Sequence, residues 1–154
     1  MAYNTVTVHS NQPSKEGTTS GAITPGMLIN WTTTAGTYLA HGDAGGANAA
    51  AMFAVEDDHQ GNDLNDAYAT ATRFLFKHYL PGDKVNALLA DGETAVVGSR
   101  LESNGDGYLR VVDADTSAGT IALGACKFVA LEALDMSGSS LVDPASQRLL
   151  IEVI

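Results

Sequence analysis

The sequence is poor in cysteine and in long apolar runs, and each shortage excludes a class of protein. Its single cysteine, Cys126, excludes an intrachain disulfide, and the apolar surroundings IALGACKFVALEAL favour a small buried thiol. No apolar run approaches the roughly eighteen residues of a membrane-spanning helix. The first residues also lack the basic start and apolar run of a secretory signal. We therefore expect a soluble protein, made in the cytoplasm, with no membrane partner.

Basic residues are scarce as well. Eight Lys and Arg stand against eighteen Asp and Glu, which gives a formal net charge of −10. Such a surface repels polyanions, so direct binding to nucleic acid is not expected. The glycines form neither a P-loop nor a dinucleotide fingerprint, and no serine lies in a G-x-S-x-G elbow. The sequence therefore offers no cofactor site and no ready catalytic set.

Turn-forming dipeptides are frequent, and short groups of apolar residues lie between them. Runs of about four to eight residues between such turns are typical of short β-strands. At 154 residues, the chain is long enough for one domain with a continuous core. We predict an all-β domain, a small β-barrel closed by its last strand. The expected strands are residues 27–32, 37–40, 52–56, 73–80, 84–90, 95–103, 108–113, 120–132 and 148–154.

One stretch has helical rather than strand spacing. In NDLNDAYATATRF, residues 62–74, apolar side chains recur every three or four residues after a candidate Asn62 or Asp63 cap. We therefore predict at most one short helix, placed in this stretch.

Residues 1–20 differ from the rest of the chain in composition. Thr, Ser, Asn, Gln and Gly dominate, and apolar residues are almost confined to the alternating YNTVTV. We expect this segment to extend as a mobile arm from the domain formed by residues 21–154. The alternation favours strand addition to a partner, with Tyr3, Val6 and Val8 as the partner-binding residues.

The stretch RLESNGDGYLRVVD has two interpretations. Glu102, Asn104, Asp106 and Asp113 approach the ligand spacing of an EF-hand calcium loop. However, the flanking TAVVGSRL and YLRVV are typical of strands, and an EF-hand needs a helix on each side. Asn-Gly and Asp-Gly are strong hairpin signals. We predict a hairpin with its tight turn at residues 104–107 and no bound ion.

A dense acidic group lies at Glu56, Asp57, Asp58 and His59, with Asp63 and Asp66 nearby. Carboxylates beside a histidine could hold a divalent ion or supply an acid and a base, although a solvated loop is the commoner role. Two alternative functions therefore stay open. One is a calcium-dependent binding module, for example for carbohydrate, and the other is a small hydrolase.

The order of several segments resembles a known family. The segments are ITPGMLINW, AHGDAGGANAAAMFAVEDDHQGNDLNDAY, HYLPGDKVNALLADGETAVVGSRLESNGDGYLRVV, ACKFVALEALD and RLLIEVI. In this order the chain, from Gly21 to Ile154, is similar to the small capsid decoration, or cement, proteins of tailed bacteriophages.

The resemblance implies a fold, a location and partners. Such proteins are compact β-barrel or β-tulip domains that bind the outside of an icosahedral shell and stiffen it against packaged DNA. It implies a virion protein without catalysis or cofactor. Its partners would be the major capsid protein and further copies of itself, often in a homotrimer at a threefold position. The apolar segments 52–55 and LLIEVI are candidate interface strands, although burial in the core is the commoner role for each residue singly.

Overall fold

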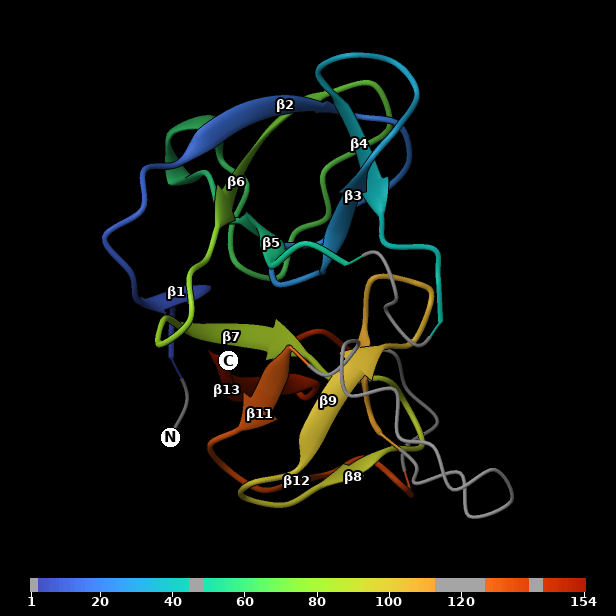
Figure 1. The fold of residues 1–154 in the computed structure, drawn as a ribbon. Helices are drawn as coiled ribbons and strands as arrows, with labels where there is room; N and C mark the ends of the chain where they lie inside the picture. Colours follow the sequence, from blue (N-terminus) through green and yellow to red (C-terminus); the bar gives the residue numbers. More distant parts are fainter. Residues whose placement is uncertain (1–2, 45–48, 113–126, 139–142) are drawn as a thin grey trace.

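The computed structural model describes residues 3–44, 49–112, 127–138 and 143–154. Our predictions for Cys126, for Asp113 and for the first part of strand 120–132 lie outside the described residues. The described strands form two large sheets and one small ribbon, and Figure 1 shows one large sheet above the other. None of the helical residues described forms a segment long and apolar enough to cross a membrane.

The upper sheet in Figure 1 has five strands in the order β3-β4-β2-β6-β5. Its strands are β2 (Lys15–Thr19), β3 (Ile29–Trp31), β4 (Thr37–Ala40), β5 (Met52–Val55) and β6 (Arg73–His78). An isolated bridge joins Leu28 to Phe53, and the amide of Gly26 donates to the carbonyl of Ala54 at 2.8 Å. These contacts link the two ends of the sheet, so it curls into a small barrel, which we call the five-stranded barrel.

The lower sheet has six strands in the order β1-β7-β13-β11-β9-β10. Its strands are β1 (Thr7–His9), β7 (Lys84–Leu88), β9 (Arg100–Ser103), β10 (Leu109–Val111), β11 (Phe128–Ala130) and β13 (Arg148–Val153). A parallel bridge from Leu89 to Leu109 brings β10 back toward β7. This sheet also curls, and we call it the six-stranded barrel. β8 (Thr94–Ala95) and β12 (Leu134–Asp135) pair as a separate ribbon.

These elements confirm the predicted all-β, barrel-like class. The expectation that the last strand closes the sheet is wrong, because β13 lies inside the sheet, hydrogen-bonded to β7 on one side and β11 on the other. Its residues alternate between buried and half-buried positions. The inner residues pack in the core of the six-stranded barrel, and the outer residues form part of its half-covered outer face.

Strand β5 belongs to both cores. All four of its residues are buried. Because side chains alternate along a strand, Met52 and Ala54 pack with the core of the five-stranded barrel, whereas Phe53 and Val55 pack with that of the six-stranded barrel. β5 is therefore a shared wall. The burial of all four side chains agrees with the core role expected for each of residues 52–55 singly.

The N-terminal segment is part of both sheets, which corrects the expectation of an extended arm. β1 pairs with β7, and β2 lies in the middle of the upper sheet between β4 and β6. The composition of this segment did not predict a central strand, because β2 is polar and contains Gly17. The glycine is needed there since it leaves room for aromatic rings. A Cβ on Gly17 would lie 2.6 Å from the ring of Tyr38 and 3.0 Å from that of Phe74.

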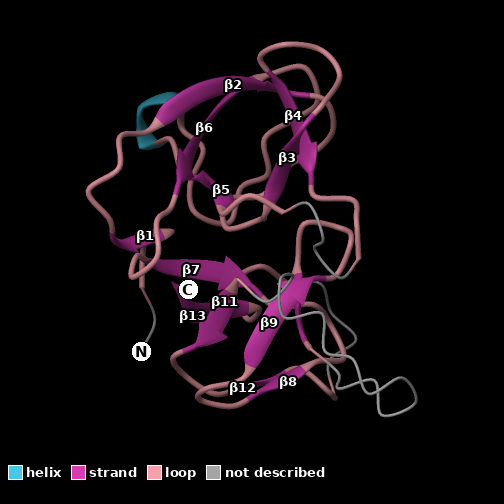
Figure 2. Ribbon diagram, viewed as in Figure 1, coloured by secondary structure: helices cyan, strands magenta, loops and turns pink. Residues whose placement is uncertain are grey.

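The prediction of at most one short helix is confirmed, but its placement in residues 62–74 is wrong. The described helical residues are one short 3₁₀ turn, Asp58–Gln60, drawn in cyan in Figure 2. Leu64 and Tyr68 are both buried, but in different cores: Leu64 in the six-stranded barrel and Tyr68 in the five-stranded barrel. The Tyr68 hydroxyl donates to the Val55 carbonyl at 2.7 Å. The apolar residues recur at helical spacing because this loop contributes one side chain to each of the two cores.

Candidate functional site

The acidic stretch 102–112 forms the predicted hairpin. β9 and β10 are antiparallel, with Ser103 opposite Leu109, and the amide of Asn104 donates to the Tyr108 carbonyl at 2.9 Å. Gly105 and Gly107 both have positive φ, 93° and 87°. The turn at residues 104–107 is thus confirmed, and its glycines are needed for its backbone conformation.

The carboxylates of this hairpin are engaged with the protein itself. Glu102 is almost buried and forms an ion pair with Arg110 at 2.8 Å. Asp106 accepts hydrogen bonds from the Asn104 side chain at 3.0 Å and the Tyr108 amide at 3.1 Å. Across the described residues, no three His, Cys, Asp or Glu side chains lie where they could hold one metal ion. Asp113 lies outside these residues.

The hairpin turn also joins the two barrels. The Gly107 amide donates to the carbonyl of His41, and the Gly107 carbonyl accepts from Leu28 at 2.8 Å. His41 is fully buried, and its Nδ1 lies 2.8 Å from the hydroxyl of Ser103. Burial lowers the pKa of His41, nearby Asp43 opposes the shift, and Lys127 adds to it. The histidine is therefore a structural contact between hairpin and barrel.

The acidic group at residues 56–66 divides into separate roles. Glu56 accepts hydrogen bonds from the Thr5 hydroxyl and, at 3.0 Å, from the Val6 amide. Asp57 is buried, whereas Asp58, His59, Asp63 and Asp66 are exposed. Glu56 thus holds the N-terminal segment in place, and the exposed members form a solvated loop beside the 3₁₀ turn.

The three predicted partner-binding residues lie in different environments. Val6 is fully buried in the core of the six-stranded barrel, so its side chain is not available to a partner in this structure. Tyr3 and Val8 are half-buried. The Tyr3 carbonyl accepts a hydrogen bond from the Asn86 side chain at 3.2 Å. Partner binding by Tyr3 and Val8 stays a prediction.

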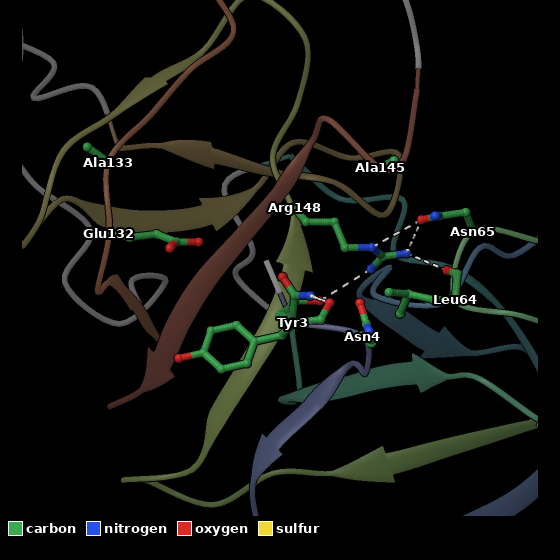
Figure 3. A pocket seen from close by; sticks show the side chains of 9 residues that line it. Tyr3, Asn4, Leu64, Asn65, Glu132, Ala133, Ala145 and Arg148 are labelled. Carbon is green, nitrogen blue, oxygen red and sulfur yellow. Dashed lines mark hydrogen bonds between the residues drawn. The ribbon is translucent and has the colours of Figure 1, made fainter. Parts of the chain in front are cut away.

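Tyr3 lines a pocket that the sequence did not indicate. The pocket has a volume of about 350 Å³. Figure 3 shows Arg148 reaching from β13 toward Asn65 and Leu64, with Tyr3 and Asn4 nearby. Its lining residues come from distant parts of the chain: Tyr3, Asn4, Leu64, Asn65, Asn86, Glu132, Ala133, Ala145 and Arg148.

Arg148 is the cation of this pocket. Its guanidinium donates to the Leu64 carbonyl, to the Asn65 side-chain oxygen at 3.2 and 3.3 Å, and to the Asn86 carbonyl at 3.4 Å. Burial lowers the pKa of Arg148 to about 10, with Glu56 and Tyr108 opposing the shift. The side chain remains charged at neutral pH. A lone arginine at the start of a strand carries no sequence signal for such a site, because its partners lie far away in the chain.

Several large apolar side chains are exposed at separate places on the surface. Val96 and Val97 occupy the turn after β8, with 59% and 68% of their surface exposed. Leu80 precedes the turn at residues 81–82 and Ile154 follows β13; the two segments adjoin where the Gly82 amide donates to the Val153 carbonyl. Trp31, at the end of β3, is 51% exposed and lies 5.9 Å from the ring of His78. These side chains offer apolar contacts to a partner.

Comparison with solved structures finds a similar fold in the crystal structure of the head fiber gp8.5 N base of bacteriophage phi29. The TM-score is 0.56 at 10% sequence identity, and the match covers 93% of this chain and 94% of that chain. No family model matches the sequence, and no curated protein matches it at a significant level. The likeness at this identity shows a shared fold.

Proposed function

We propose that this chain is a non-enzymatic structural protein that binds the outer surface of a tailed-bacteriophage capsid and stabilises the shell against the pressure of packaged DNA. The observation that carries the proposal is the fold shared with the phi29 head fiber base over nearly the whole chain. The segment order of the sequence resembles capsid decoration proteins independently of that comparison.

The chemistry of the chain agrees with a structural role. The acidic side chains closest to a catalytic or calcium-binding arrangement are used to hold strands and turns, as Glu56 and Glu102 do. The net charge of −10 disfavours contact with DNA, which the capsid wall would keep on its other side. Exposed Trp31, Val97 and Leu80 supply the apolar contacts that a protein partner needs.

We further propose that copies meet in homotrimers at threefold positions of the shell. A unit that stiffens a shell must touch several capsid subunits, and a copy at a threefold axis meets its symmetry mates there. The partners are then the major capsid protein and the chain itself. Density on decorated capsids should appear at threefold positions; isolated single copies would contradict this part of the proposal.

The test of the main proposal uses capsids of the phage that encodes the chain, prepared without it. The purified chain is mixed with DNA-filled capsids and separated by sedimentation, and DNA release on heating is followed with a dye. We expect saturable binding and a higher release temperature. A full-length, folded chain that fails to co-sediment with these capsids would refute the proposal.

A further inference from the structure

We propose that the Arg148 pocket binds the carboxylate of an acidic side chain on a capsid subunit. This inference rests on the proposed function, because that function supplies the partner. It adds a site and a ligand chemistry: a Glu or Asp side chain, with its neighbouring main chain, entering the pocket between β13 and the N-terminal segment. The cavity itself is present in the isolated chain.

Charge is the first argument. Every described hydrogen bond of Arg148 goes to a neutral oxygen, of Leu64, Asn65 or Asn86. The ion pairs found in the described part of the chain join Arg73 to Glu16 and Arg110 to Glu102. Glu56 is near enough to raise the pKa of Arg148, but none of the described hydrogen bonds of the guanidinium goes to a carboxylate. A partly desolvated guanidinium gains electrostatic energy when an anion approaches it directly. The pocket therefore favours a negatively charged group.

Donor geometry is the second argument. A guanidinium carries five N–H groups, two of them on Nη1, and Nη1 makes one of the described hydrogen bonds. No described hydrogen bond uses the second N–H of Nη1, which lies beside Gly26. Asn65 and Asn4 line the same cavity, and their side-chain amides are also donors. A carboxylate accepts several such hydrogen bonds at once.

The size and charge of the pocket select the class of ligand. A volume of about 350 Å³ exceeds what a lone carboxylate fills, and Leu64, Ala133 and Ala145 give part of the lining an apolar character. That part suits the methylenes of a Glu side chain and the adjacent main chain. The apolar part of the lining favours such a side chain over an inorganic phosphate, which has no methylenes to place there. An acidic peptide segment fits best.

The first experiment tests the site without capsids. The full chain is titrated with N-acetyl-glutamate N-methylamide and, as the neutral isostere, with the corresponding glutamine compound. Nuclear magnetic resonance follows the Arg148 Nε–H and the Asn65 side-chain amide. We expect saturating shifts with the glutamate compound only, at a dissociation constant of about 1 mM, which corresponds to about 4 kcal/mol of binding free energy. Equal shifts with both compounds, or no shifts, would overturn the proposal.

Two variants separate the site from the fold. Ala145→Trp places an indole in the pocket and leaves Arg148 unchanged, and we expect glutamate binding about tenfold weaker or lost. Ala35→Trp, at an exposed position of the β3–β4 loop, is the matched control and should bind like the wild type. Both should melt like the wild type. An Ala145→Trp chain that binds the glutamate compound unchanged would contradict the proposal.

The capsid assay identifies the source of the carboxylate. We expect Ala145→Trp to decorate capsids more weakly than Ala35→Trp. If the wild type binds the glutamate compound but no capsid, the proposed function is wrong. The capsid subunit is then also not the source of the carboxylate. If Ala145→Trp decorates as well as Ala35→Trp, the function stands and the capsid subunit is not the source. Each result thus identifies which of the two statements is wrong.

Discussion

The two barrels differ in what fills them. The core of the five-stranded barrel is rich in aromatic rings: Tyr38 lies 4.5 Å from Phe76 and 5.8 Å from Phe74, and Tyr68 lies 5.8 Å from Phe74. The core of the six-stranded barrel is mainly aliphatic. Flat rings in a small barrel need room at the backbone, which Gly17 supplies. Aliphatic side chains fill the larger core without such a device.

This difference makes the two barrels sensitive to different changes, although they share β5. The five-stranded barrel depends on a polar, glycine-containing strand from the N-terminal segment. The six-stranded barrel depends on alternating apolar strands from the C-terminal half. The following changes test whether this contrast holds and whether the shared wall makes the barrels unfold together.

Deletion of residues 2–20 should have the largest effect. It removes β2 from the middle of the five-stranded barrel and Val6 from the core of the other barrel. Because a central strand pairs on both sides, we expect loss of cooperative folding, measured by circular dichroism and urea unfolding. A shorter deletion, of residues 2–4, is the control and should still fold. A 2–20 deletion that melts like the wild type would show that the segment is a dispensable arm.

Truncation of one aromatic ring in each core tests the shared wall. Phe74→Ala and Phe128→Ala each remove a fully buried ring, from the five-stranded and six-stranded barrels respectively. Each should lower the free energy of unfolding by about 3–5 kcal/mol. Since β5 belongs to both cores, we expect one unfolding transition in both variants. The exposed Val97→Ala should change stability by less than about 0.5 kcal/mol.

Two separate transitions in Phe74→Ala, seen by tryptophan fluorescence of Trp31 and by far-ultraviolet circular dichroism, would contradict this prediction. They would mean that the five-stranded barrel unfolds while the six-stranded barrel stays intact.

The hairpin turn that joins the barrels can be tested at Gly107. A Cβ there would lie 3.0 Å from the Cβ of Ala40, and φ is 87°. Gly107→Ala should therefore cost about 1–3 kcal/mol from backbone strain and crowding together. Gly36→Ala is the matched control. Its φ is 75°, and a Cβ there would have no neighbour within 4 Å, so this variant measures the cost of backbone strain alone. Equal losses of unfolding free energy in the two variants would show that the turn is not packed against the five-stranded barrel.

Lowering the pH should destabilise the same junction, with a smaller loss of unfolding free energy than Gly107→Ala causes. Burial lowers the pKa of His41, so below about pH 6.5 the unfolded chain binds a proton more readily than the folded chain. The free energy of unfolding should then decrease as the pH falls, by at most about 1.4 kcal/mol per pH unit for one group. Asp43, Lys127 and the Ser103 hydroxyl are the groups near the imidazole.

Urea unfolding at about pH 7.5 and about pH 5.5 measures this effect. His41→Asn should show a weaker dependence on pH than the wild type. His78 keeps part of the dependence, because burial and Lys15 lower its pKa as well. The exposed His59→Asn is the control. The prediction fails if His41→Asn and the wild type lose the same free energy between these two pH values.

The sequence by itself determined the class of fold and most strand positions. Turn dipeptides and period-two alternation are local signals, and they placed β4 at Thr37–Ala40 and the hairpin turn at residues 104–107, as the structure has them. Local signals failed where a residue's role depends on a distant partner. Gly17 reads as a loop residue until the rings of Tyr38 and Phe74 are placed above it.

Only the tertiary structure decided which strand is shared by the two cores and where the candidate pocket forms. Met52 and Phe53 are neighbours in the sequence but belong to different cores, because the chain passes between two barrels that local patterns do not position. Arg148 meets Asn65 across a separation of 83 residues. Such a contact follows from how the sheets curl and pack, and it leaves no periodic or compositional trace along the chain. The fold class is encoded locally, whereas the candidate site exists only through long-range packing.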